Sequence, residues 1–178
     1  AANGAGRGGT STGLDAGVRL PGVSRIDLPK DGKFNVVVLG SADATRYPES
    51  IRALSGKILY TVYLRVGLRK NWILQYCLAK EPQGSASRKG STPPLDAPWP
   101  YIIERPDRWS ASDPDYIMVH GLITAAGKFD QLALVSPNDL EKKDLLLDSL
   151  KLWDFRPASR DGEPTAVEVL LIIPHEAE

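Results

Sequence analysis

Residues 138–174 read NDLEKKDLLLDSLKLWDFRPASRDGEPTAVEVLLIIP, and they contain a helix pattern, a turn signal and a long apolar run. Leu146, Leu150 and Trp153 recur at the i, i+4, i+7 spacing that lines one face of an α-helix. A helix with one such apolar stripe is stable when another element covers that stripe. The spacing therefore predicts a helix over residues 138–153, with Trp153 buried against a sheet.

Local signals mark the ends of this helix and the strand that follows it. Asn138, with Glu141 three residues later, is typical of an N-terminal capping box. The helix has to end before Pro157, because the residue that precedes a proline is pushed out of the α region. Asp161-Gly162 indicates a turn. Residues 164–174 are rich in Val and Ile and have a proline at each end, which predicts a strand.

The order of these parts resembles the end of the TonB C-terminal domain family. In that family a helix ends in W-x-F-x-P-A, an x-x-D-G-x-P turn follows, and a long apolar strand closes the fold. The residues that carry the resemblance are Trp153, Phe155, Pro157, Ala158, Asp161, Gly162 and Pro164. An alternative interpretation is that the aromatic pair only seats a helix end in a core, without any relation to partners.

The length and the charge balance exclude some classes of function. With 178 residues the chain is long enough for one domain with its own core. Lys and Arg number 22, as do Asp and Glu, so the formal net charge is zero. This balance argues against nucleic acid or an anionic membrane surface as the main partner, because both require a concentrated positive field. No apolar run approaches the roughly 20 residues of a membrane-spanning helix.

The first residues have the composition of a linker. Residues 1–22 hold seven of the sixteen glycines and few large apolar residues, so we expect a flexible tail there and a single domain over residues 23–178. The opening Ala1-Ala2-Asn3-Gly4 has neither the basic nor the apolar part of a signal peptide. We therefore expect the chain to be a piece of a longer protein, with any membrane anchor in the missing part.

The middle of the chain predicts two hairpins and a long loop. Residues 57–66 alternate as a half-buried strand does, and residues 72–78 run back from it. A loop rich in Pro, Ser and Gly is expected over residues 81–98. Residues 99–103 predict a short edge strand because Pro100 cannot donate a ladder hydrogen bond. A second hairpin, over residues 116–135, leads directly into the helix.

Taken together, these elements predict an α+β fold: a mixed, mostly antiparallel sheet with two hairpins and the helix 138–153 packed on one face. A short helix with proline in its first turn is expected around Arg46-Tyr47-Pro48, and this Tyr-Pro, helix, hairpin order again resembles the opening of the TonB family. The second hairpin is a departure, because a typical family member has one. One sequence does not decide whether the extra hairpin extends the same sheet.

No pattern for catalysis or metal binding accompanies the reactive side chains. His120 and His175 lack a companion at metal-ligand spacing, and Cys77 is the only cysteine. Cys77, on an alternating strand, is better interpreted as a buried apolar residue than as a nucleophile. We therefore expect no enzyme activity, no cofactor and no metal.

The resemblance implies a function in the cell envelope. In the TonB family this domain lies in the periplasm, is anchored to the inner membrane, and binds an extended segment of an outer-membrane transporter by strand addition. A long final strand with one open edge has the unpaired N–H and C=O groups for this. An alternative is an assembly module that forms a homodimer through the same edge. The predicted partner-binding residues are Arg46, Tyr47, Pro48, Val167, Glu168, Val169, Leu170, Leu171 and Ile172.

Overall fold

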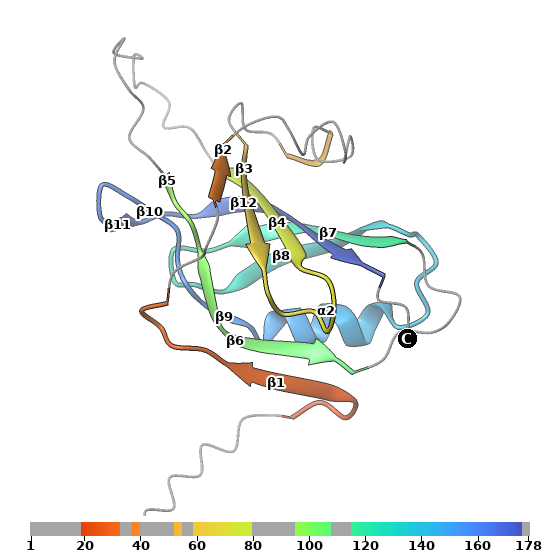
Figure 1. Cartoon of the computed structure of the whole chain (residues 1–178). Helices are drawn as coiled ribbons and strands as arrows, with labels where there is room; N and C mark the ends of the chain where they lie inside the picture. The colour runs from red at the N-terminus through yellow and green to blue at the C-terminus, as the bar shows by residue number, and fades with distance from the viewer. Residues whose placement is uncertain are drawn as a thin grey trace, which may run out of the picture.

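The computed structural model describes residues 19–32, 37–39, 52–54, 59–79, 95–107 and 115–175, and within them the chain is an α+β domain (Figure 1). Its elements are β1 (Val23–Asp27), β2 (Val37–Leu39), β3 (Tyr60–Leu64), β4 (Trp72–Leu78), β5 (Leu95–Asp96), β6 (Trp99–Pro106), β7 (Tyr116–Ile123), β8 (Phe129–Ser136), α2 (Lys143–Lys151), β9 (Asp154–Arg156), β10 (Ser159–Arg160), β11 (Glu163–Pro164) and β12 (Val167–Pro174).

The main layer is a six-stranded sheet in the order β2-β3-β4-β12-β7-β8. Both predicted hairpins are confirmed, as β3–β4 and β7–β8. All the strand pairs in the described ranges are antiparallel. The first hairpin extends the same sheet as the second, because β4 and β7 flank β12 on its two sides.

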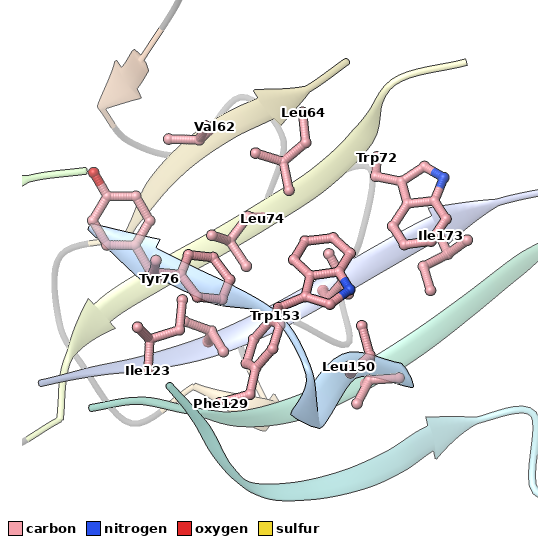
Figure 2. Packing of buried hydrophobic residues seen from close by; sticks show 14 of the residues in the cluster. Val62, Leu64, Trp72, Leu74, Tyr76, Ile123, Phe129, Leu150, Trp153 and Ile173 are labelled. Atoms are coloured by element: carbon pink, nitrogen blue, oxygen red, sulfur yellow. The ribbon is translucent and has the colours of Figure 1, made fainter. Parts of the chain in front are cut away.

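The helix packs on one face of this sheet, as the apolar stripe predicts. Leu146 and Leu150 are fully buried, and so is Trp153, which follows the helix. The Trp153 ring stacks on that of Trp72 from β4 (Figure 2), with 5.9 Å between the ring centroids. The centroid of the Phe155 ring also lies 5.9 Å from that of Trp153. Its indole Nε1–H donates to the main-chain oxygen of Glu104 on β6. Trp153 therefore joins the sheet, the helix end and β6 in one core.

The helix begins later than its sequence pattern suggests. Helix α2 spans Lys143–Lys151, whereas residues 138–142 form turns, and Lys142 stands at the N-cap without a side-chain cap. The predicted capping box is therefore wrong. In the turn, the Lys143 N–H donates to the Leu140 carbonyl oxygen, and the Leu140 side chain belongs to the core. The burial of the Leu140 side chain in the core outweighs the local capping signal.

Two small sheets lie beside the main one, in the orders β1-β6-β9 and β11-β10-β5. The prediction of an edge strand at residues 99–103 is wrong, because β6 lies between β1 and β9. Pro100 is tolerated because β1 pairs with β6 only from Ile102 to Pro106, so at Pro100 the strand is paired with β9 alone. Leu95–Asp96, at the end of the predicted loop, form β5. Most of that loop and the predicted tail lie outside the described residues.

The turn of the second hairpin is fastened to β9 through Gly127. The Phe155 N–H donates to the Gly127 carbonyl oxygen, and Gly127 has a φ of +77°. A Cβ atom at this position would lie 2.0 Å from the Phe155 carbonyl oxygen. This turn therefore requires glycine for both its conformation and its close approach.

Gly127→Ala is expected to destabilise the fold by more than the roughly 1–3 kcal/mol of left-handed backbone strain alone, because the methyl group also displaces β9. Gly162→Ala is the matched control, since Gly162 has a φ of +79° and nothing within 4 Å of the added Cβ. The loss of melting temperature in Gly162→Ala measures the backbone strain alone, and the additional loss in Gly127→Ala measures the clash with Phe155. Equal losses in melting temperature would contradict this account of Gly127.

Candidate functional site

The predicted partner-binding strand is the middle of the sheet rather than its edge. Residues Val167–Ile172 of β12 pair with β4 on one side, from Leu78 to Ile73. They pair with β7 on the other side, from Ile123 to Met118. The prediction of an open edge along β12 is therefore wrong. The physical reason is the additional hairpin, whose strand β4 occupies the position where an external strand was expected.

The side chains of β12 are also covered. Val167, Val169 and Leu171 belong to the core cluster that contains Trp153. Leu170 and Ile172 belong to a second cluster on the opposite face, with Ile73, Cys77 and Met118. Of the predicted residues, Arg46, Tyr47 and Pro48 lie outside the described ones, so that part stays a prediction.

Several polar side chains lie on the second face, among them the buried Gln75 and Thr61, and one of them, Glu168, belongs to β12. The Glu168 carboxylate accepts a hydrogen bond from His120 Nε2 on β7, at 2.8 Å, and its other oxygen lies 3.8 Å from the thiol sulfur of Cys77 on β4. These three residues are far apart in the sequence, and no known motif spacing would have grouped them. The strand register brings them together, because Glu168 lies directly opposite Cys77.

The order of this group decides what it can do chemically. The Glu168 carboxylate contacts both the His120 imidazole and the Cys77 thiol, whereas in a cysteine nucleophile pair the imidazole itself holds the thiol. Cys77 is also fully buried. We interpret the group as the way in which a buried face satisfies one carboxylate. In the described part of the chain, no three His, Cys, Asp or Glu residues are grouped to hold a metal ion.

Strand β8 is one of the two edges of the main sheet in the described part of the chain. This strand pairs with β7 and is the last in the strand order of the described residues. Its register shifts twice, and Gln131 has a φ of +50° with its N–H bound to the Asp130 side chain at 2.8 Å. Such irregularities limit unwanted pairing at an edge. One shift lies between Asp130 and Ala133 and the other between Leu134 and Ser136, so Ala133, which is exposed, and Leu134 are the regular part of this edge that can accept a strand.

The opposite end of the sheet is less suited to strand addition. There, β2 has three residues and pairs with β3 from Tyr60 to Val62. Strands this short contribute few main-chain hydrogen bonds to a partner.

Within the described ranges no helix is long and apolar enough to cross a membrane.

Comparison of the chain with family models, curated proteins and solved structures finds no match.

Proposed function

We propose that this chain is a protein-interaction module that binds an extended segment of a partner by adding it to the main sheet along β8. The observation that carries the proposal is that β8 ends the strand order of the main sheet among the described residues, beside the β7–β8, α2, β12 unit. In this unit a hairpin leads into a helix and then into a strand that pairs antiparallel with β7. Main-chain groups on such an edge supply affinity, and pockets for alternate side chains supply specificity.

The resemblance to the TonB C-terminal domain family supplies the partner and the compartment in this proposal. The partner is then an extended segment of an outer-membrane transporter, and the domain acts in the periplasm, held to the inner membrane by an anchor outside this chain. Trp153 and Phe155 support the resemblance, since the pair packs together in the core at the end of the helix. The function requires no catalytic residue and no cofactor.

Strand addition at β8 is favoured over addition at β12 because β12 would first have to separate from β4. A partner at β12 must displace β4, whose Trp72, Leu74 and Tyr76 are at most 1% exposed. Returning each such side chain to water costs about 1.5–3 kcal/mol, before the lost main-chain pairing is counted. A strand added at β8 displaces none of them.

The test uses proline at two neighbouring positions of β8. The N–H groups of successive strand residues point to opposite sides, so one of Ala133 and Leu134 presents its N–H outward. Peptides that bind the chain are first selected from a displayed library of random ten-residue peptides. They are then titrated against Ala133→Pro and Leu134→Pro. We expect one variant to lose the peptides while keeping its melting temperature, and the other to be destabilised.

Ala133→Thr is the matched control, since it changes the side chain and keeps the N–H; it should bind like the parent. If both proline variants fold and bind the peptides like the parent, addition at β8 is wrong. Sedimentation of the chain alone tests the alternative function, in which the same edge pairs with a second copy. A homodimer that one of the two prolines dissociates would identify an assembly module instead.

A further inference from the structure

The described chain begins with a strap that lies outside the main sheet. Residues 19–32, called here the N-terminal strap, contain β1, which pairs with β6 at five positions from Val23 opposite Pro106 to Asp27 opposite Ile102. Two further main-chain bonds extend this pairing, from Asp107 to Gly22 at 2.9 Å and from Leu28 to Tyr101 at 2.7 Å. Figure 1 shows β1 at the periphery, next to β6 and away from the six-stranded sheet.

The strap is held through main-chain hydrogen bonds and through side-chain contacts, among them Ser24 with Asp107 and Lys30 over the Tyr101 ring. The Trp99 indole Nε1–H donates to the Pro29 carbonyl oxygen at 3.0 Å, and Arg156 donates to the Lys30 carbonyl oxygen at 3.1 Å. None of the fully buried apolar side chains belongs to the strap; Ile26 and Leu28 are partly buried against the core. The strap can therefore leave β6 while the main sheet stays packed, as expected of a segment with low local stability.

A buried carboxylate under the strap gives this edge a chemical preference. Glu104 of β6 is 4% exposed, and within the described residues its ion-pair partner is Arg25, which lies directly opposite at 3.8 Å. Arg25 also binds the Asp27 carboxylate of its own strand at 3.0 Å. Burial raises the pKa of the Glu104 carboxyl, an effect that the Arg25 charge opposes. A strand on this edge is therefore favoured when it carries a cation opposite Glu104.

We propose that the β6 edge is a strand-acceptor site, and that its occupant in assemblies is the N-terminal strap of a second copy of this chain. A strap from a second copy can make every contact that the strap makes within one chain. It would pair with β6 in the same register, place Arg25 opposite Glu104, and offer the same carbonyl oxygens to Trp99 and Arg156. Exchange of identical elements is an accessible route to dimers because each contact is kept. This site is separate from β8, so the proposal stands without the function proposed above.

The decisive experiment joins two chains through one β1–β6 pair. One full chain carries Asp27→Cys, a second, differently tagged chain carries Ile102→Cys, and the two are mixed and oxidised. Directly opposite residues on antiparallel strands have Cα atoms about 4.5–5.5 Å apart, which suits a disulfide. We expect a mixed covalent dimer whose yield rises with protein concentration. Pro21→Cys mixed with Ile102→Cys is the control, because Pro21 has no opposite residue on β6.

A chain with both Asp27→Cys and Ile102→Cys shows whether the register itself is right, since it should close the disulfide within one chain. If that variant closes and the mixed dimer does not exceed the Pro21→Cys control at any concentration, the exchange is wrong. If it does not close, the β1–β6 register is wrong and the acceptor site with it.

A pair of charge variants tests the chemical preference. In the Asp27→Cys chain, Arg25→Glu places a carboxylate opposite Glu104 and is expected to lower the yield of mixed dimer at least about tenfold. Glu104→Gln in the Ile102→Cys chain should restore most of that yield, because it removes the repulsion. A loss that Glu104→Gln does not restore would contradict the role of Glu104 in selecting the strand.

Discussion

Trp153→Ala is expected to lower the free energy of unfolding by about 3–5 kcal/mol, the usual range for truncating a large buried aromatic side chain. Trp153 has no exposed surface, and the rings of Trp72, Phe129 and Phe155 surround it within 6 Å of its centroid. Its removal also leaves the Glu104 carbonyl oxygen without its indole donor. Urea unfolding followed by circular dichroism measures the change.

Trp99→Ala is the matched control, because Trp99 is a half-buried tryptophan that also donates to a carbonyl oxygen, that of Pro29. It fastens the strap rather than the core, so we expect a smaller loss. Equal losses for the two tryptophans would mean that the centre of the fold does not lie at Trp153.

Val169→Pro should prevent the fold from forming. Val169 lies between Tyr76 of β4 and Gly121 of β7, so its N–H points toward a paired strand whichever way it faces. Proline removes that donor and introduces a ring into a position with no exposed surface, which the middle of a sheet does not tolerate. We expect little soluble protein and no cooperative thermal transition.

Val169→Ala is the control that separates the loss of side-chain packing from the loss of the backbone N–H. It removes two methyl groups and keeps the N–H, so the variant should fold with reduced stability. A Val169→Pro protein that melts like the alanine variant would show that β12 has an open edge, which is the position that the sequence analysis predicts.

The elements that depend on local periodicity could be predicted. The apolar stripe of Leu146, Leu150 and Trp153 located the helix and its buried face, and alternation located both hairpins. The helix start could not be found in this way, because the position of Leu140 depends on a core that distant strands build. A capping signal is worth about 1 kcal/mol, so a buried leucine can override it.

The predicted edge position of β12 is wrong, although the sequence of the strand itself carries a signal against it. Strand β12 reads VEVLLIIP, and a nearly continuous apolar run is typical of a strand covered on both faces. The apolar run therefore favours a central position of β12 in the sheet over an edge position. The contact of Glu168 with Cys77 on the second face depends on register, because the two are 91 residues apart in the chain. Only the pairing of β4 with β12 places them opposite each other.

The central place of β12 has a consequence for the order of events during synthesis. Both hairpins precede β12 in the chain, yet it is β12 that joins them into one sheet. Until residues 167–174 have left the ribosome, or have crossed a membrane if the chain is exported, β4 and β7 each present an unpaired edge. Exposed edges of this kind attract other chains, and long-range strand pairing is slow. A nascent or truncated chain that stops before Val167 should therefore depend on chaperones far more than the completed domain does.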